Sequence, residues 1–344
     1  MLTPHTRLLA WAACLCAPLL APGQPADAPA GLAYSGQSRW NPADGTLAFV
    51  TSGAMPDGKE SFFWQVPADV RRIVIGSNVV VRGGFRVLPR ADGNALLIAG
   101  AERNTSVLWG TDEEQWTVRN GVADNAKWRY GAVSLLGDAT VRIEGLTSRN
   151  PRGYHFSGYA PKAVLHVARC NILDTRPGSQ NNSDGFVGAA GSTLADTFIS
   201  TGDDAVKVYH DISVRNVVIE QHRNGAPLQL GWGGAGDEVR ADIENLTIRG
   251  ASPDGRYNMA PISWEGGSRG TRRLTIRGLS VAVAGSVYAE EAKAWRPLGL
   301  FELKPTGCAV DIAITGASLG GLGLGDWRTP GTIVLNGQAT TRPR

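Results

Sequence analysis

A short pattern of apolar and polar positions recurs along the second half of the chain. An apolar residue is followed by two residues of unspecified type, then by an apolar or small residue, a polar or small residue and usually another apolar one. Its seven copies begin at Ile143, Val167, Leu194, Val214, Ile243, Ile276 and Ile314. Successive copies are 24, 27, 20, 29, 33 and 38 residues apart. The repeated unit therefore has a constant element joined by loops of unequal length.

A second short apolar run follows each copy, at residues 154–156, 185–187, 205–209, 227–230, 261–264, 300–304 and 332–335. Rungs of two or three short strands with uneven loops are typical of a solenoid, because only the strands have to stack, about 4.8 Å apart. Tight two-residue hairpin turns are scarce, which disfavours a β-sandwich. The pattern therefore predicts an all-β chain folded as a right-handed parallel β-helix.

The apolar runs upstream of the repeats indicate where the β-helix domain begins. Residues 73–81 and 95–98 have the pattern of earlier rungs, so we expect the parallel β-helix catalytic domain over residues 66–344 and an N-terminal cover of its open end over 31–65. Arg7 precedes an apolar run at 8–21 that is too short to span a bilayer. We therefore predict a signal peptide at 1–30 and a secreted or periplasmic protein.

Composition narrows the possible partners. The formal net charge is only +3, and charged residues make up 19% of the chain, which favours neither nucleic acid nor a membrane as partner. The sequence has no metal-ligand spacing of His and Cys and no phosphate-binding loop, so we expect no cofactor and no metal, and a monomeric protein. Cys170 and Cys308 lie about five rungs apart, or roughly 24 Å, which is too far for a disulfide bond.

Three carboxylates carry the candidate chemistry. Phe186 and Val206 are the first buried residues of successive second strands, so Asp184 and Asp204, each two residues earlier, share one register. Two like charges only one rung apart repel each other, so the pKa of one of these two carboxyls should be raised. Asp203 completes a set able to hold one proton and orient one water, as glycosidic hydrolysis requires. Because consecutive residues of a strand face opposite sides, the backbone must bend at this point, and we expect Asp203 to be turned away from the pair.

Counting by twos from the buried residues gives the candidate substrate contacts. Lys207, Tyr209, Gln229 and Glu265 fall on the outer face, where Lys207 is expected to touch either the substrate or the aspartates. On such a groove wall, Lys207→Ala should weaken hydrolysis and leave the fold intact. Two further candidates have alternatives: His155, one rung before Asp184, which can be structural, and Trp232, which can stack on sugar or pack internally.

These residues resemble glycoside hydrolase family 49, the dextranases and isopullulanase. The resemblance covers roughly residues 170–235 and rests on Asp184-Gly185, on the run from Gly202 to Tyr209, and on the run from Ala226 to Trp232. That family has an Asp-Asp-Ala-x-Lys-x-Tyr stretch followed by Pro-x-x-Gln-x-Gly-Trp. The resemblance implies an inverting, endo-acting hydrolase of an α-glucan, with Asp203 as general acid and with Asp184 and Asp204 activating water. The predicted signal peptide makes this a secreted enzyme, and the absence of a uronate-binding cation motif favours a neutral glucan.

Two departures leave alternatives open. Family 49 enzymes carry a β-sandwich domain ahead of the β-helix, for which this chain has no room. The run Asn182-Ser183-Asp184 is also similar to the Asn-Thr-Asp of family 28 polygalacturonases, but those enzymes need a Gly-His-Gly, where Trp232 stands here, and an Arg-x-Lys. The alternatives are therefore a polygalacturonase-like or other β-helix polysaccharide hydrolase, and a non-catalytic carbohydrate-binding β-helix.

Overall fold

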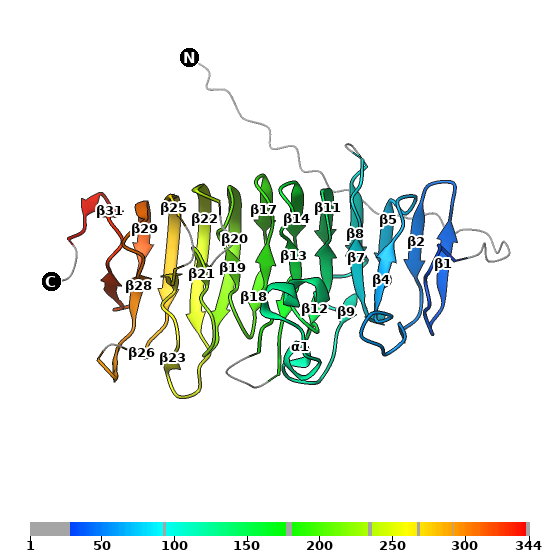
Figure 1. The fold of residues 1–344 in the computed structure, drawn as a ribbon, viewed down its shortest axis with the longest axis horizontal. Helices are drawn as coiled ribbons and strands as arrows, with labels where there is room; N and C mark the ends of the chain where they lie inside the picture. The colour runs from blue at the N-terminus through cyan, green and yellow to red at the C-terminus, as the bar shows by residue number, and fades with distance from the viewer. Residues whose placement is uncertain are drawn as a thin grey trace, which may run out of the picture.

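The chain forms an elongated stack of β-strands. The computed structural model describes residues 28–91, 94–176, 181–232, 236–266, 269–290 and 292–341, and the strands follow one another along the long axis from the N-terminal to the C-terminal rungs (Figure 1). The predicted signal peptide lies outside the described residues except for 28–30. Among the described helices, none has the length and apolar character needed to cross a membrane.

One face of the stack is a sheet of ten parallel strands. Its members, in stacking order, are β4 (Phe63–Val66), β7 (Gly84–Val87), β10 (Val133–Leu135), β13 (Phe156–Gly158), β16 (Phe186–Val187), β19 (Val206–Lys207), β21 (Leu228–Gln229), β24 (Ile262–Trp264), β28 (Gly299–Leu303) and β30 (Gly323–Trp327). These strands hold the predicted second run of each rung except the last. The prediction of a parallel β-helix is confirmed.

The remaining faces form a sheet of nineteen strands that wraps around the same core. Its strands are β1 (Ser38–Asn41), β2 (Thr46–Phe49), β3 (Gly53–Ala54), β5 (Arg72–Ile75), β6 (Val80–Arg82), β8 (Leu96–Gly100), β9 (Val107–Trp109), β11 (Ala139–Glu144), β12 (Thr147–Arg149), β14 (Ala163–Ala168), β15 (Asn171–Leu173), β17 (Ser192–Ala195), β18 (Phe198–Ser200), β20 (Ile212–Gln221), β22 (Glu238–Gly250), β25 (Thr271–Ala282), β29 (Ala309–Ser318), β31 (Gly331–Leu335) and β32 (Gln338–Ala339). The single strand β20 pairs with both β17 and β18, so two strands of one rung become one bent strand in the next.

A corner within the nineteen-stranded sheet falls at one position of the recurring sequence pattern. The third residue of every copy has a positive φ between 50° and 74° in the described chain: Gly145, Arg169, Asp196, Asn216, Asn245, Gly278 and Gly316. Glycine, Asn and Asp adopt this left-handed conformation at the least cost. The side chains also stack, since Asn216 donates to Asp196 (2.8 Å) and Asn245 donates to Asn216 (3.0 Å).

Inward-facing residues of the ten-stranded sheet stack in register to form the core. Phe156, Phe186, Val206, Leu228 and Ile262 are Cα partners from one rung to the next, and each is fully buried. Each rung therefore covers the apolar side chain of its neighbour, which is the main stabilisation available to a stack of short strands.

The structure differs from the sequence analysis in the role of residues 31–65 and in the strand that residues 332–335 form. Strands β2, β3 and β4 pair in parallel with β5, β6 and β7, so most of the predicted cover at 31–65 is the first rung, and only β1 pairs antiparallel, on β2. The run at 332–335 belongs to β31, which pairs with β29 in the large sheet. The second strand of that last rung is β30.

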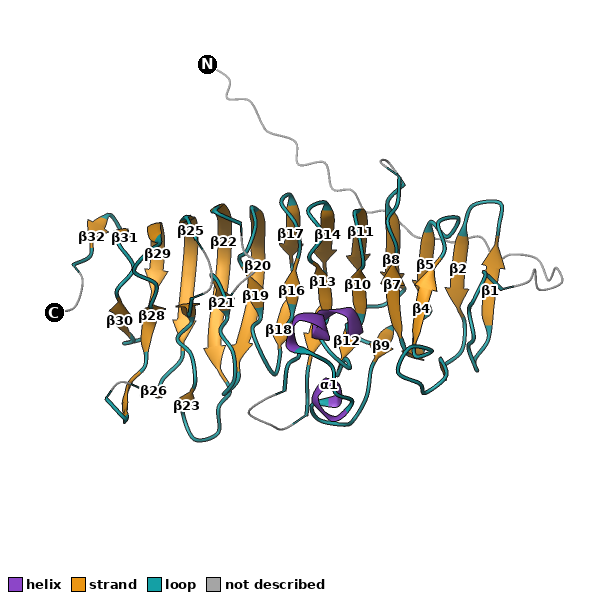
Figure 2. Ribbon diagram, viewed as in Figure 1, coloured by secondary structure: helices purple, strands orange, loops and turns teal. Residues whose placement is uncertain are grey.

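Two additions project from the stack (Figure 2). The loop between β9 and β10 contains α1 (Trp116–Arg119) and the 3-10 helix η1 (Asp124–Tyr130), and a small sheet is built from β23 (Arg256–Tyr257), β26 (Ser286–Ala289) and β27 (Ala294–Pro297). Cys170 and Cys308 are both buried, and no disulfide joins them in the described chain.

Candidate active site

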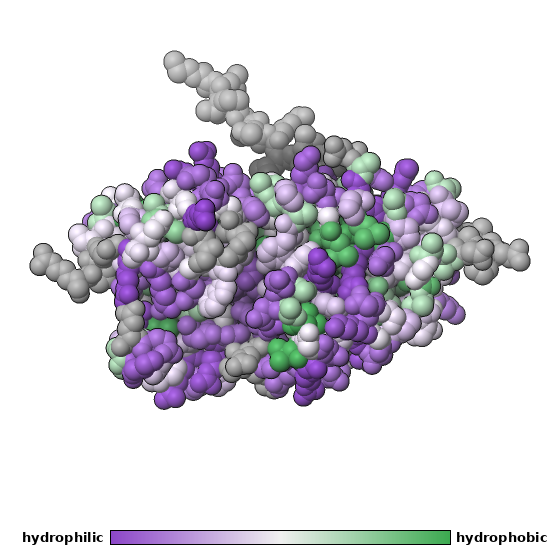
Figure 3. Space-filling view, in the orientation of Figure 1, coloured by the Kyte–Doolittle hydropathy of each residue, from purple (hydrophilic) through white to green (hydrophobic). Residues whose placement is uncertain are grey.

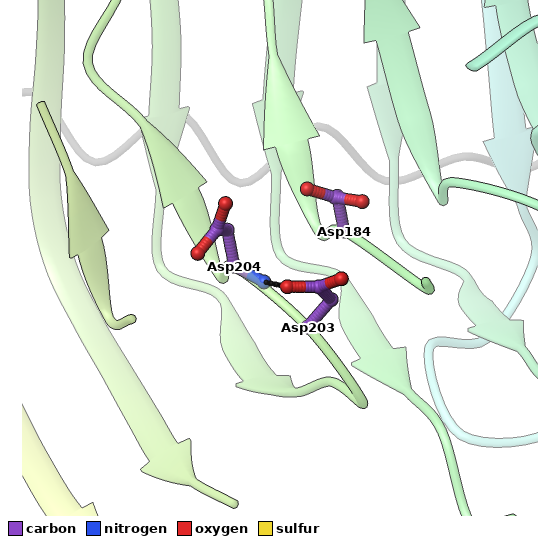
Figure 4. A group of neighbouring side chains, drawn as sticks. All are labelled: Asp184, Asp203 and Asp204. Carbon is purple, nitrogen blue, oxygen red and sulfur yellow. Dashed lines mark hydrogen bonds between the residues drawn. The ribbon is translucent and has the colours of Figure 1, made fainter. Parts of the chain in front are cut away.

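The three aspartates lie together at the start of two neighbouring strands. Asp184 precedes β16 by two residues and Asp204 precedes β19 by two, and the pairing of Phe186 with Val206 places both carboxylates in one register, as predicted. Each of Asp184, Asp203 and Asp204 offers a carboxylate oxygen within 4.8 Å of the other two. In Figure 4, Asp203 lies close to both of the others, below the strands that they precede.

A bend in the loop brings Asp203 to the same side as Asp204. The backbone N–H of Asp204 donates to Asp203 Oδ1 (2.9 Å), and the Thr201 hydroxyl donates to the Asp203 carbonyl (2.7 Å). Gly225, with φ +72°, packs so closely on this bend that a Cβ there would lie 2.3 Å from the carbonyl carbon of Asp203. The predicted bend is confirmed, but the expectation that Asp203 is turned away from the pair is wrong.

Lys207 joins the other two carboxylates. Its Nζ lies 2.6 Å from Asp184 Oδ1 and 2.7 Å from Asp204 Oδ2, and the three side chains are only 7%, 3% and 6% exposed, in the order Lys207, Asp184, Asp204. The second oxygen of Asp204 accepts from the backbone N–H of Ala226 (2.9 Å). Of the two roles predicted for Lys207, contact with the aspartates is the one the structure contains.

Burial and the repulsion between like charges raise the pKa of two of the three aspartates. Burial raises the pKa of Asp184 to about 6, against the opposing charge of Lys207. Burial, followed by the charges of Asp184 and Asp204, raises the pKa of Asp203 well above its usual value. Asp203 is also the one member of the three that keeps partial exposure. The cluster therefore places a partly exposed carboxyl with a raised pKa beside a buried pair of carboxylates.

Tyrosine rings enclose Lys207. The rings of Tyr154 and Tyr209 are each centred 5.5 Å from its Nζ, so the ammonium meets π faces as well as the carboxylates. Tyr154 was missed as a site residue, although its position can be read from the sequence. It precedes Phe156 by two residues, as Asp184 precedes Phe186, and so occupies the same register one rung earlier.

The other predicted contacts divide by exposure. Tyr209 and Gln229 are buried, and Gln229 Oε1 accepts from the backbone N–H of Gly231 (3.2 Å). Neither side chain is placed to touch a polymer. Glu265 is partly exposed and its Oε2 lies 2.5 Å from Lys304 Nζ. Trp232 is 59% exposed, so of its two predicted roles only an open ring for stacking fits.

His155 does not join the site. It is fully buried, and its Nδ1 lies 2.8 Å from the Ser148 hydroxyl. The chain turns just before β13, which points this side chain inward, and Ala205, two rungs further on, is part of the apolar core. Counting by twos from Phe156 is therefore wrong here, and the structural alternative for His155 is the correct one.

One polar residue that the sequence analysis did not propose for the site, Asn182, contacts Asp203, and a second, Lys127, contacts Asn182. Asn182 Nδ2 donates to Asp203 Oδ2 (2.9 Å), and Lys127 Nζ, from η1, donates to Asn182 Oδ1 (2.8 Å). Asn182 lies two residues before Asp184 in the same motif, and this closeness in sequence could have marked it as a site residue. Lys127 is far away in sequence within an insertion, and its place could not be read from the repeat.

The acidic cluster has the donor type that hard cations prefer, but not an open centre. Its three carboxylates lie within reach of one ion. The Lys207 ammonium already sits between Asp184 and Asp204. A divalent cation would have to displace it, so the side chains present fit an ion-paired lysine better than a metal.

Comparisons with known proteins agree with the resemblance to dextranases found in the sequence. No family model matches the chain. A dextranase from Arthrobacter globiformis is 25% identical over 192 residues, and one from Arthrobacter sp. (strain CB-8) is 26% identical over 192 residues, each match covering 53% of this chain and 28% of the relative. The solved structure of Dex49A from Penicillium minioluteum aligns with 81% of this chain and 55% of its own, with a TM-score of 0.47 and 12% identity. The resemblance to dextranases is thus confirmed over about half of this chain, which matches little more than a quarter of those relatives' length.

Proposed function

We propose that this chain is a secreted glycoside hydrolase that cleaves α-glucosidic bonds of a neutral, dextran-like glucan. One observation carries the proposal: a partly exposed carboxyl, Asp203, lies beside two buried carboxylates that one ammonium bridges. The similarity to dextranases over about half of the chain supports the substrate class. The view in Figure 3 shows a mainly hydrophilic face with apolar side chains in small separate patches, which suits a sugar polymer better than an apolar ligand.

The proposed reaction uses each carboxyl once. Protonated Asp203 gives its proton to the glycosidic oxygen as the bond from that oxygen to the anomeric carbon breaks. A water molecule held by Asp184 and Asp204 attacks the anomeric carbon and leaves its proton on one of them. Because the pKa of Asp184 is about 6, activity should rise as the pH increases through that value, and it should fall when Asp203 loses its proton.

Net inversion is part of the proposal. Inverting enzymes separate acid and base by about 6.5–9.5 Å and retaining enzymes by about 5–5.5 Å, whereas the nearest oxygens here lie within 4.8 Å of one another. That span joins oxygens rather than carboxyl centres. Support for inversion comes from the partners: both oxygens of Asp204 accept from donors, and Asp184 is ion-paired with Lys207. Neither carboxylate is free to attack a sugar carbon, whereas both can orient a water.

A uronic acid polymer fits less well, because the cations around the aspartates are already paired. Among the described residues, four cations have an acidic partner within ion-pair distance: Lys207 with Asp184 and Asp204, Lys127 with Asp124, Arg176 with Asp174, and Lys304 with Glu265. A uronate carboxylate needs a cation to offset its desolvation. A neutral sugar does not.

A binding role without catalysis is also less well supported. Burial and mutual repulsion raise the pKa of Asp184 and Asp203, so this arrangement opposes folding at neutral pH. Perturbed carboxyls of this kind gather at sites that do chemistry. A surface that only holds a glycan has no use for a proton donor beside two buried anions.

The deciding experiment compares substrates. Purified protein is incubated with dextran, pullulan and polygalacturonate, and new reducing ends are counted over time, with Asp203→Asn as the control. We expect release from dextran or pullulan that the variant lacks. Release from polygalacturonate alone would support the family 28-like alternative, and binding without turnover on any of the three would support the non-catalytic one.

A further inference from the structure

The insertion between β9 and β10 is linked to the proposed general acid, Asp203, through one intervening side chain. Lys127, in η1, is nearly buried, with its side chain 11% exposed, and its Nζ lies 2.6 Å from Asp124 Oδ1. The same Nζ donates to Asn182 Oδ1 (2.8 Å), and Asn182 Nδ2 donates to Asp203 Oδ2 (2.9 Å). A chain of three polar groups thus runs from a surface helix to the catalytic cluster.

The direction of this chain is fixed by its first member. An ammonium group can only donate hydrogen bonds, whereas a carboxamide has one accepting end and one donating end. The end of Asn182 that meets Lys127 must therefore be its oxygen, and the end that meets Asp203 must be its NH₂ group. Without the ammonium, the amide is free to turn over and present its oxygen to Asp203.

We infer that Lys127 is a positioning residue that holds the Asn182 amide with its donor end toward Asp203. Its importance for hydrolysis rests on the proposed function, in which Asp203 is the general acid. Lys127 itself touches neither Asp203 nor, on this view, the substrate, and it acts only through the orientation of one amide.

The orientation matters because of what else faces Asp203. Asp184 and Asp204 repel its anion, Lys207 attracts it, and the Tyr154 hydroxyl lies nearby. The backbone N–H of Asp204 already donates to Oδ1, so a second donor on Oδ2 stabilises the carboxylate left when the proton leaves. A turned amide would instead accept from the protonated carboxyl and hold the proton in place.

The test measures the titration of Asp203 directly, with ¹³C-labelled aspartate and the carboxyl resonance assigned by its loss in Asp203→Asn. In Lys127→Met we expect the pKa of Asp203 to rise by about one unit, since a hydrogen bond to a charged group is lost and one to the neutral form is gained. Lys127→Arg keeps a donor and should titrate like the parent. In kinetics on dextran, the alkaline limb of kcat/KM should move upward with the Met variant by a similar amount.

A double-mutant cycle separates orientation from charge. In an Asn182→Ala background no amide remains to turn, so adding Lys127→Met should leave the pKa of Asp203 unchanged. An equal shift in both backgrounds would mean that the Lys127 charge acts directly, and no shift in the parent background would mean that it does not act at all. Either result overturns the inference. The titration needs no turnover, so a failure of the proposed hydrolase function would not be mistaken for a failure of this inference.

Discussion

Two regions on the same edge of the ten-stranded sheet bury charge in opposite ways. In the arginine–aromatic region, Arg152 lies 3.5 Å from the centre of the Phe62 ring and 4.5 Å from that of Trp116. Its side chain is 5% exposed, whereas that of its partner Asp57 is 85% exposed. In the catalytic cluster, Asp184 and Asp204 are themselves buried along with Lys207. One region buries only the cation, and the other buries both signs.

We expect the arginine–aromatic region to stabilise the fold and the catalytic cluster to serve the reaction, because burial costs the two regions different amounts of free energy. A guanidinium stacked on aromatic rings is weakly hydrated and loses little on burial, and an exposed acid keeps its water. Two buried carboxylates on one ammonium leave an unbalanced negative charge, which opposes folding. A polar cavity of about 420 Å³ adjoins the first region and is lined in part by Arg152, Asp57 and Trp116.

The largest expected effect separates the two regions by activity. Asp203→Asn should reduce hydrolysis of dextran by roughly 10²–10⁴-fold, the usual contribution of a general acid. The melting temperature should stay the same or rise, because a repelled carboxyl is replaced by a neutral group of the same shape. Initial rates and a thermal melt measure both. Asp57→Asn, the matched change in the arginine–aromatic region, should leave the rate unchanged, and equal losses in both variants would contradict the comparison.

Removing the buried cation should mainly affect stability. Lys207→Met leaves Asp184 and Asp204 buried without their partner, and breaking a buried ion pair in this way costs about 3–5 kcal/mol. The burial of Lys207 thus replaces the expectation from sequence that its loss leaves the fold intact. Urea unfolding at pH 7 measures the change. A variant as stable as the parent would mean that the two carboxylates are not held as anions.

The pH dependence of stability should have opposite signs in the two regions. The pKa of Asp184 is raised to about 6 in the folded chain, so its contribution is full below the unfolded value near 4 and is lost as the pH rises through 6. That loss amounts to about 3 kcal/mol, since each unit of pKa shift corresponds to about 1.4 kcal/mol. The arginine–aromatic region also contains Arg86, which lies 4.6 Å from the centre of the Phe63 ring beside Phe62. The hydrogen bond from Arg86 lowers the pKa of exposed Glu60, whose small contribution is instead lost as the pH falls.

Unfolding free energies from pH 4 to 7 measure these slopes. Asp184→Asn should remove the decline between pH 4 and 6, while Glu60→Gln should leave it in place. Parallel curves for the parent and Asp184→Asn would show that the carboxyl titrates alike in the folded and unfolded chain.

The smallest effect should come from the arginine–aromatic region. Arg152→Met loses the contacts with Phe62 and Trp116 and the hydrogen bond to the Gly58 carbonyl (3.0 Å), which together should cost about 1–2 kcal/mol. Activity per folded molecule should match the parent at low temperature. A fall in kcat without loss of stability would place Arg152 in the reaction.

Much of the fold was predictable because the rungs repeat. Positions such as Phe186 and Val206 face inward for the same reason in every rung, and register alone then brings Asp184 beside Asp204. The left-handed corner at Asn216 and Asn245 falls within each copy of the pattern, but the apolar positions on either side of it were what made the pattern visible in sequence.

The errors fall where the chain leaves the repeat. His155 is turned inward by a bend that alternation cannot anticipate, and 332–335 resembles a second strand because both kinds of strand are short and apolar. Lys127 reaches Asn182 from an insertion, a contact that depends on tertiary folding alone. The turn before β13 and the contact made by the insertion were therefore beyond reach of the sequence, and the second of them bears on the site.

The most direct test follows the first products of dextran by proton NMR, which records turnover and stereochemistry together. Water delivered by Asp184 and Asp204 to the face opposite the leaving oxygen should give the β-anomer first, with the α-anomer appearing later by mutarotation. An α-anomer present from the start would contradict inversion and require a covalent intermediate. No product at all from dextran or another α-glucan would contradict the assignment of the three aspartates to hydrolysis.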